Sequence, residues 1–403
     1  MCGSKDKLTV IGGGTGGCQA ALYAAKNGLA VTLYEQARIG GTCLHIGCMP
    51  TKALLSAPAR PWQDMTRQIR GKLELLESGM AKQLRRAGVR VCRQAAPRQL
   101  PADEAVILAI GAQRSPLPQI PGKCLYDYAS VLEMDELPEE LAILGAGVSG
   151  MEYAQIFARL GCCVTVYEQS EMILPGFAEE YAVRLMELCM QDGIDFVCGE
   201  PVEPERIPQK HILWTGRSQA MDHSRMRQLA AAGIEIAPDG IVTDSCWRTS
   251  RSGVYAIGDC VAGSHTAFVA LQAARMAVDS ILGRDPGVLG AVPQTVCGSY
   301  DLFCVGQWEG LSAEARMDHS GYAFLQERMD GAVRLVCDDK GILTGAQLLC
   351  PGAAETGSLL TAAINSRMPV ETLARTLFFH PSYMETIKDA AVELYDLYRK
   401  QTD

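Results

Sequence analysis

The 403-residue sequence has no lysine- and arginine-rich run, no apolar stretch of membrane-spanning length and no secretory leader before its first apolar segment. The missing basic run and the formal net charge of −9 argue against nucleic acid as a partner. The missing apolar stretch and leader argue against a membrane or secreted protein. We therefore expect a cytoplasmic protein with neither a nucleic-acid nor a membrane partner.

The composition is that of a globular protein, with 48% hydrophobic and 21% charged residues. At roughly 150 residues per domain, the length predicts two or three domains. The chain contains 16 cysteines, and many of them stand singly in apolar surroundings. We expect those to be unpaired, buried thiols in a reducing compartment.

The first glycine-rich turn lies in LTVIGGGTGGCQAALYAAKNGLAVTLYEQ, residues 8–36. The stretch predicts a strand, a turn with Gly12, Gly14 and Gly17, an alanine-rich helix, a second strand and then Glu35. Such glycines let a dinucleotide pyrophosphate approach the helix N-terminus, and the acid accepts hydrogen bonds from a ribose. A glycine turn packed for steric reasons alone is the alternative.

The second glycine-rich turn, in LAILGAGVSGMEYAQIFARLGCCVTVYEQSE, repeats this pattern with Gly145, Gly147 and Gly150. Glu168 comes after the third glycine at the same interval as Glu35 does in the first copy. No arginine stands beside Glu168 to meet a 2′-phosphate, so this site is expected to prefer NAD to NADP. The alternative is that Glu168 only ends a strand.

A third turn, TSRSGVYAIGDCVAG, carries Gly258 and Asp259 and precedes a predicted helix over residues 266–282. With these three turns the chain resembles the class I flavin-dependent pyridine nucleotide-disulphide oxidoreductases, and most of all the dihydrolipoyl dehydrogenases. The resemblance implies FAD at the first turn and at Gly258 and Asp259, and NAD at the second turn.

The implied fold is α/β, with two Rossmann-like nucleotide-binding domains and a C-terminal α+β dimerisation domain. The expected boundaries are residues 1–115 and 253–287 for the FAD-binding domain, 116–252 for the NAD-binding domain, and 288–403 for the dimerisation domain. In the last of these we expect strands over residues 301–308, 322–328, 331–339 and 342–350, then helices from Ala354 and Pro381.

The stretch Cys43-Leu-His-Ile-Gly-Cys48-Met-Pro-Thr-Lys52 comes soon after the first turn. From the residues alone, the cysteine pair could be a redox pair or two unrelated thiols. A zinc site would need further Cys or His ligands that the sequence does not offer at the usual spacing, so no metal is expected. The resemblance implies a redox disulfide in which Cys43 exchanges with substrate and Cys48 faces the flavin. We expect a lowered pKa for Cys48, because it lies near a helix N-terminus and the flavin.

The resemblance also implies that Lys52 and Glu152 pair beside the flavin, where a cation stabilises negative charge on the reduced ring. Two solvated helix charges are the alternative. In LFFHPSYMETIKDA, His380 is the expected base, held by Glu385 and reaching into the partner subunit of a homodimer. A neutral imidazole oriented by a carboxylate is a suitable thiol base near neutral pH.

The sequence departs from the family in two connections, residues 89–112 and 196–216, which are short and predicted to be abbreviated antiparallel excursions. It also has Cys297-Gly298-Ser299-Tyr300-Asp301 where the family commonly has Tyr-Thr-x-Pro-Glu. The resemblance implies oxidation of dihydrolipoamide on a separate lipoylated carrier protein of a 2-oxo acid dehydrogenase or glycine cleavage system. The alternatives are an NAD(P)H-dependent reductase of a low-molecular-weight disulfide and a flavin- or NAD-binding redox sensor without turnover.

Overall fold

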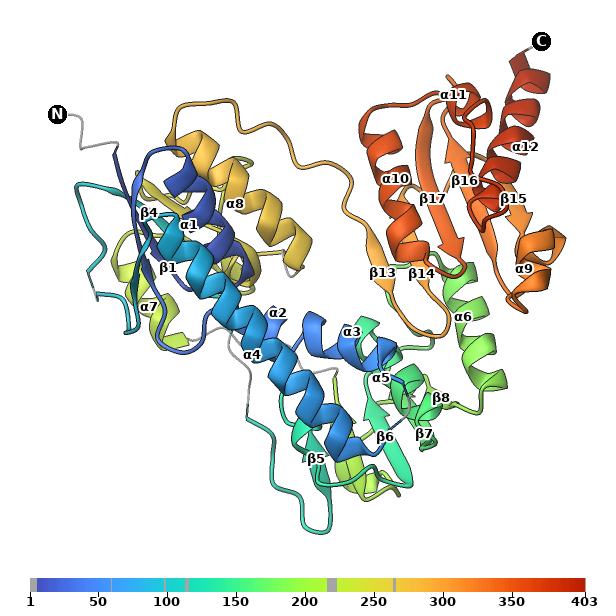
Figure 1. The fold of residues 1–403 in the computed structure, drawn as a ribbon, viewed down its shortest axis with the longest axis horizontal. Helices are drawn as coiled ribbons and strands as arrows, with labels where there is room; N and C mark the ends of the chain where they lie inside the picture. Colours follow the sequence, from blue (N-terminus) through green and yellow to red (C-terminus); the bar gives the residue numbers. More distant parts are fainter. Residues whose placement is uncertain are drawn as a thin grey trace. The chain divides into compact units, whose positions relative to one another are not determined.

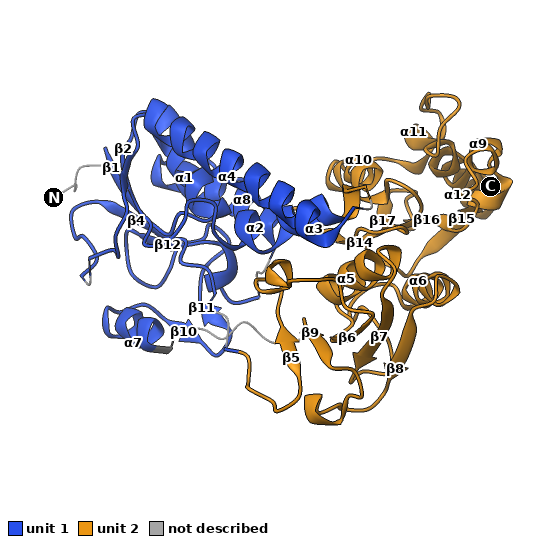
Figure 2. Ribbon diagram, turned by 60° about the horizontal axis from the view of Figure 1, so that its bottom comes forward, with its two compact units in different colours: residues 1–54, 60–116, 217–289 blue, residues 55–59, 117–216, 290–403 orange. Residues whose placement is uncertain are grey.

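The structure is a computed structural model that describes residues 6–58, 60–97, 99–112, 116–215, 223–263 and 266–402. The chain divides into two compact units, which are coloured separately in Figure 2. Unit 1 comprises residues 1–54, 60–116 and 217–289, and unit 2 comprises residues 55–59, 117–216 and 290–403. No helix of the described residues is both long enough and apolar enough to cross a membrane.

Unit 1 is built on a five-stranded sheet in the order β12-β4-β1-β2-β3, and all of its neighbouring strands are parallel. Its strands are β1 (Lys7–Ile11), β2 (Ala30–Tyr34), β3 (Arg90–Cys92), β4 (Ala105–Leu108) and β12 (Val254–Ala256). Its helical segments and a small hairpin are α1 (Thr15–Lys26), α2 (Gly41–His45), α3 (Cys48–Ser56), α4 (Trp62–Arg86), α7 (His223–Ala231), β10 (Ile236–Ala237), β11 (Gly240–Ile241), η3 (Gly258–Cys260) and α8 (Ala267–Ile281).

Helices α1 and α8 pack against each other beside this sheet (Figure 1). Both bury alanines, Ala20, Ala21 and Ala24 from α1 and Ala273, Ala274 and Ala277 from α8. Small side chains allow two helices to approach closely. The N-termini of α1 and of η3, which precedes α8, are therefore held by one shared core.

Unit 2 contains a second parallel sheet in the order β5-β9-β6-β7-β8, which repeats the strand arrangement of unit 1. Its elements are β5 (Cys124–Tyr126), η1 (Val131–Glu133), β6 (Glu140–Leu144), α5 (Val148–Arg159), β7 (Cys163–Glu168), α6 (Glu179–Gln191), β8 (Asp195–Cys198), η2 (Pro204–Arg206) and β9 (His211–Trp214). The two nucleotide-binding folds predicted from the glycine turns are thus both present as parallel α/β sheets.

The rest of unit 2 forms an antiparallel sheet in the order β13-β14-β17-β16-β15. Helix α10 contacts β14 and β17, and α12 contacts β15 and β16 (Figure 1). The elements are β13 (Gln294–Val296), β14 (Leu302–Gly306), β15 (Leu311–Arg316), η4 (Met317–His319), α9 (Gly321–Leu325), β16 (Ala332–Cys337), β17 (Leu343–Leu349), α10 (Ala353–Asn365), α11 (Val370–Ala374) and α12 (Glu385–Thr402).

The predicted strand over residues 322–328 is wrong, because this stretch contains helix α9. The Ser320 hydroxyl caps the helix by accepting the Ala323 N–H, and Tyr322 packs edge-on against Tyr383. The predicted antiparallel excursions are wrong as well. No strand lies among the described residues between β3 and β4 or between β8 and β9, and the second gap holds only the 3₁₀ turn η2.

Candidate active site

The first glycine turn lies between β1 and α1, and two of its glycines are required by the packing of the backbone. Gly12 has φ +106°, and a Cβ there would lie 2.1 Å from the Ala109 carbonyl oxygen. A Cβ on Gly17 would lie 1.9 Å from the Gly12 carbonyl oxygen. A Cβ on Gly14 would meet no protein atom within 4 Å, so packing within the chain does not require glycine at that position.

Glu35 closes the first turn from the end of β2. Its carboxylate accepts the Gly13 N–H at 2.6 Å and the Ala37 N–H at 2.6 Å. These bonds fix the carboxylate beside the turn, at the position where a ribose hydroxyl is recognised in dinucleotide folds.

The second glycine turn has the same geometry. Gly145 has φ +106°, a Cβ on Gly150 would lie 1.9 Å from the Gly145 carbonyl oxygen, and a Cβ on Gly147 would meet nothing within 4 Å. Glu168 accepts the Ala146 N–H at 2.7 Å and the Ser170 N–H at 3.0 Å. Glu168 therefore does more than end a strand, because its carboxylate is held beside the turn.

Both turns fit a dinucleotide. The N-cap residues Gly14 and Gly147 provide no side-chain cap, so the first N–H groups of α1 and α5 receive no hydrogen bond from the N-cap side chain. In unit 1, the Thr266 hydroxyl before α8 is buried and has no hydrogen-bond partner among the described residues. A polar cofactor beside η3, which carries Gly258 and Asp259, supplies a partner for such a group.

The cysteine pair is attached directly to the first turn. The Gly40 N–H donates to the Gly13 carbonyl at 2.7 Å, and Gly40 also forms a β-bridge with Gly14. A Cβ on Gly41 would lie 2.8 Å from the Gly14 Cα, so this contact requires glycine. Helix α2, which carries Cys43, therefore begins against the nucleotide turn, and α3 begins at Cys48.

Cys43 and Cys48 are both free thiols in this structure and interact with each other. The interaction with Cys48 lowers the pKa of Cys43 to about 6 against the opposing effect of burial, and Thr15 and the charge of Lys52 act in the same direction as Cys48. The same thiol contact raises the pKa of Cys48. The lowered pKa that we expect at Cys48 depends on the flavin and stays a prediction.

The two charges predicted to pair beside the flavin lie in different units. In unit 1, the ammonium group of Lys52 favours the thiolate forms of Cys43 and Cys48. In unit 2, Glu152 is buried on α5, and its carboxylate accepts the Cys297 N–H at 3.0 Å. Each residue thus has a defined role within its own unit, and their pairing stays a prediction.

His380 and Glu385 form the pair expected from the sequence. His380 Nδ1 lies 2.8 Å from Glu385 Oε1, and the second carboxylate oxygen accepts the Ser382 N–H at 3.1 Å. The histidine bond, together with the weaker effect of the Ser382 bond, lowers the pKa of Glu385. With Nδ1 directed at a carboxylate, the Nε2 atom is the one left for an external proton, and the imidazole is 81% exposed.

Sequence reasoning missed two residues of the site. Thr15 acts to lower the pKa of Cys43, but a threonine at the start of a helix gives no signal for this effect. Cys297 holds Glu152 through its backbone, which any residue type except proline can do. The departure from the family at Cys297 does not reveal this contact, because Cys297 and Glu152 are 145 positions apart in the sequence.

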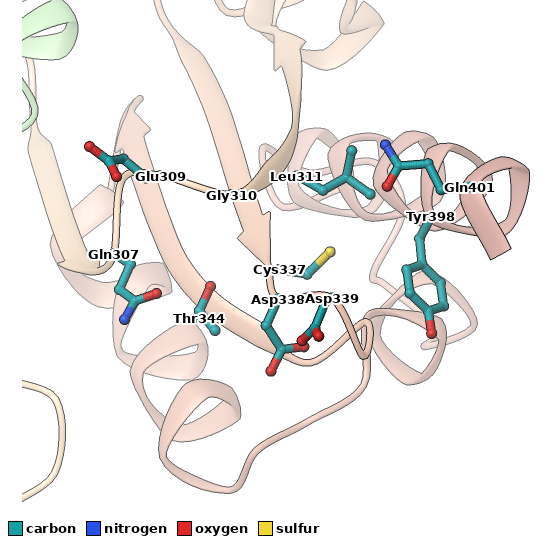
Figure 3. Close-up of a pocket in the computed structure, with 10 residues that line it drawn as sticks. All are labelled: Gln307, Glu309, Gly310, Leu311, Cys337, Asp338, Asp339, Thr344, Tyr398 and Gln401. Atoms are coloured by element: carbon teal, nitrogen blue, oxygen red, sulfur yellow. The ribbon is translucent and has the colours of Figure 1, made fainter.

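A cavity of about 470 Å³ lies in the antiparallel part of unit 2 (Figure 3). Its lining includes Glu309, Asp338, Asp339 and Tyr398, and none of the predicted site residues. The Asp338 carboxylate accepts the backbone N–H groups of Lys340 and Ile342 and so stabilises a turn. The cavity therefore gives no support for a separate catalytic centre.

The profile of the pyridine nucleotide-disulphide oxidoreductases matches residues 6–279, and that of their dimerisation domain matches residues 311–391. The chain therefore belongs to the pyridine nucleotide-disulphide oxidoreductase family. It is an α/β oxidoreductase, and FAD and NAD are its cofactors. The dimerisation domain supports a homodimer.

Three relatives are similar over nearly the whole chain. A dihydrolipoyl dehydrogenase of Haloferax volcanii is 30% identical, covering 96% of this chain and 95% of the relative. A dihydrolipoyl dehydrogenase of Bacillus subtilis is 25% identical, covering 97% and 99%. The probable oxidoreductase RclA of Escherichia coli is 28% identical over 96% and 98%. A solved structure of RclA, a flavoprotein disulfide reductase in complex with Cu(II), has a TM-score of 0.86 at 24% identity, covering 97% of this chain and 99% of that one.

Proposed function

We propose that this protein is an NAD-dependent dihydrolipoyl dehydrogenase, which oxidises dihydrolipoamide carried on a separate lipoylated protein. The observation that carries the proposal is the pair of interacting thiols, Cys43 and Cys48, attached to the first nucleotide turn. A thiol whose pKa is lowered forms more of the reactive thiolate at neutral pH, as disulfide exchange requires. The dihydrolipoyl dehydrogenases among the relatives support the choice of substrate.

In the first step of the proposed reaction, His380 Nε2 accepts the proton of one substrate thiol. The substrate thiolate attacks Cys43 Sγ in the Cys43–Cys48 disulfide, a new sulfur–sulfur bond forms, and Cys48 leaves as a thiolate. The imidazolium that results is stabilised by Glu385, whose carboxylate is 2.8 Å from Nδ1.

In the second step, His380 has released the first proton to solvent and its Nε2 accepts the proton of the other substrate thiol. The sulfur of that thiol then attacks the substrate sulfur of the mixed disulfide. Cys43 then leaves as a thiolate, the product is a cyclic disulfide, and two electrons remain on the cysteine pair. The positive charge of Lys52 favours both thiolates. FAD and NAD, when bound, supply the acceptors for this electron pair.

We assign FAD to a domain of residues 1–115 and 253–287, NAD to residues 116–252, and dimerisation to residues 288–403. Gly12, Gly14, Gly17, Glu35, Gly258 and Asp259 would hold FAD, and Gly145, Gly147, Gly150 and Glu168 would hold NAD. The acidic Glu168 favours the two ribose hydroxyls of NAD over a 2′-phosphate.

A second candidate is reduction of a low-molecular-weight or protein disulfide with NADH. It is favoured by the likeness to RclA, described as a disulfide reductase induced by hypochlorous acid, in both sequence and structure. The two candidates use the same cysteine pair in opposite directions. A sensor without turnover is less consistent with His380 held by Glu385, because a sensor needs no substrate base.

The test compares substrates on the FAD-loaded protein. We expect NAD reduction with free dihydrolipoamide and a higher kcat/KM with a lipoylated carrier domain, both lost in Cys48→Ser. Turnover with disulfides and NADH, but none with dihydrolipoamide, would replace the first candidate with the second. No turnover with either class would leave the sensor.

The base is proposed to act across the dimer, so that Cys43 meets His380 of the partner subunit. His380→Ala should lower the rate by roughly 10²- to 10⁴-fold. A heterodimer of Cys43→Ser and His380→Ala chains, isolated with two tags, has one doubly defective and one intact site if the site is shared. It should retain about half of the wild-type activity. Background activity in an FAD-loaded heterodimer would place both groups in the same chain.

A further inference from the structure

Thr215 comes directly after β9, the strand that lies beside β6 in the second nucleotide fold. Its backbone N–H donates to the Leu144 carbonyl at 2.9 Å. Its hydroxyl oxygen lies 2.9 Å from the Gly145 carbonyl oxygen and 3.3 Å from that of Leu144. A hydroxyl has one proton, and the Leu144 carbonyl already accepts the N–H, so the shorter bond to Gly145 is favoured. Thr215 therefore holds the first glycine of the second turn.

The Gly145 carbonyl and the Ala146 N–H belong to the same planar peptide group. The N–H donates to the Glu168 carboxylate at 2.7 Å, and the carbonyl accepts the Thr215 hydroxyl at 2.9 Å. Two side chains thus hold this one peptide group from its two sides. Gly145 has φ +106° and no Cβ to restrict it, so these bonds limit the rotation of the peptide group. The orientation of the Glu168 carboxylate is in this way connected to Thr215.

The first turn has an alanine at the matching position. Ala109 follows β4, and its N–H donates to the Ile11 carbonyl at 2.8 Å, as the N–H of Thr215 does at the end of β6. A Cβ added to Gly17 would lie 3.2 Å from the Ala109 Cβ. A Cβ added to Gly150 would lie 3.0 Å from Thr215 Oγ1. The backbone of such a turn therefore forms without a hydroxyl at this position, and the second turn has one hydrogen bond more.

We propose that Thr215 is a positioning residue for NAD, whose hydroxyl holds the Gly145–Ala146 peptide group in the orientation that presents Glu168 to the ribose. The inference rests on the proposed function, which assigns NAD to the second turn. A turn that is ordered before the ligand arrives loses less freedom on binding. Without the hydroxyl, the free protein spends part of its time with this peptide group rotated, and the apparent affinity falls with the fraction that remains competent.

The test is a calorimetric titration of the FAD-loaded protein with ADP-ribose, which has the pyrophosphate and the adenosine ribose of NAD but no nicotinamide to react. Thr215→Val should raise the Kd roughly three- to tenfold, because the hydrogen bond to the Gly145 carbonyl is lost. Thr215→Ser, which keeps the hydroxyl, should retain the wild-type Kd. Thr215→Ala, which copies the residue of the first turn, should behave like Thr215→Val.

Thr165→Val is the matched control, with the same change of side chain in the same sheet. Thr165 lies on β7, and its hydroxyl accepts the Gln209 side-chain N–H at 3.1 Å. Its loss should leave the Kd for ADP-ribose unchanged. FAD content and thermal stability are measured for every variant, and both should stay at the wild-type level in Thr215→Val.

A titration in the Glu168→Ala background separates positioning from a general effect on the fold. The peptide group has lost its N–H partner in this background, so removing the hydroxyl as well should change the Kd by less than about twofold. A residue that only stabilises the fold would change the Kd by the same factor in both backgrounds.

An unchanged Kd in Thr215→Val, an equal rise in Thr215→Ser or Thr165→Val, or an undiminished effect in Glu168→Ala would overturn the inference and leave the proposed function in place. Wild-type protein that does not bind ADP-ribose would instead reject the assignment of NAD to the second turn, and the inference with it. Loss of dihydrolipoamide turnover with a normal Thr215 effect would reject the proposed substrate and keep the role of Thr215.

Discussion

The two nucleotide turns of this chain are nearly identical in backbone, but they lead into different segments of the chain. In each, a Cβ added to the third glycine would lie 1.9 Å from the carbonyl oxygen of the first glycine. In each, a carboxylate accepts an N–H of the turn, at 2.6 Å for Glu35 and 2.7 Å for Glu168. In each, the middle glycine faces open space.

The segment after the second strand makes the difference. At the first turn the Gly13 carbonyl accepts the Gly40 N–H, and the chain continues into the cysteine helices. At the second turn the equivalent Ala146 carbonyl accepts the Leu174 N–H, and the chain continues toward α6. The same anchoring bond thus holds a reactive pair in one fold and a plain connection in the other. We propose that the turn supplies cofactor binding, while the segment anchored to it determines the chemistry.

The largest expected effect on activity comes from replacing the reactive thiol beside the first turn while leaving the nucleotide site of that turn unchanged. Cys43→Ser should lower dihydrolipoamide oxidation to background, because a hydroxyl does not replace the thiol in exchange. The FAD content should stay at the wild-type level, since Cys43 is not part of the turn. Cys163→Ser, at an exposed cysteine of the second fold, is the control and should retain full activity.

A smaller effect is expected on cofactor affinity, and it should distinguish the FAD turn from the NAD turn. Gly14 has φ −70°, which alanine adopts freely, so Gly14→Ala adds a methyl group only where the FAD pyrophosphate would lie. At about 1–3 kcal/mol for the added contact, FAD affinity should fall roughly 5- to 160-fold. Gly147→Ala should raise the KM for NAD by a similar factor and leave bound FAD unchanged.

Gly71→Ala in α4 is the control for this pair, because it too has open space around an added methyl group and no positive φ. FAD content, the KM for NAD and thermal stability are measured for all three variants. A fall in stability at Gly14→Ala, with unchanged FAD affinity, would show that the glycine serves the fold and not the cofactor.

The smallest effect concerns nucleotide choice. Glu168→Arg should shift the kcat/KM ratio toward NADP by about tenfold, or roughly 1.4 kcal/mol, because a guanidinium replaces a carboxylate at the ribose. Glu35→Gln at the equivalent position of the first turn should leave this ratio unchanged. Equal shifts in both variants would contradict the assignment of the second turn to NAD.

The strand–turn–helix units predicted from the glycine motifs are confirmed, because local geometry requires a residue type there. The glycines at Gly12, Gly17 and Gly145 are required by positive φ or close contacts, and these same contacts define the fold. The strand prediction for residues 322–328 was wrong because their apolar pattern suits a strand as well as a short helix. The Ser320 cap favours the helix.

The tertiary contacts of the site could not be predicted. The Glu152 carboxylate accepts the Cys297 N–H, and the two residues lie in segments that are distant in sequence.

An anaerobic titration of the FAD-loaded protein with dihydrolipoamide, monitored by visible spectroscopy before any NAD is added, tests the central claim most directly. If the anchored Cys43–Cys48 pair takes electrons from this substrate, one equivalent per chain should produce the long-wavelength absorbance band of a thiolate beside oxidised flavin. The band should be absent in Cys48→Ser. A spectrum unchanged by excess dihydrolipoamide, or a flavin that bleaches without the band, would contradict the account.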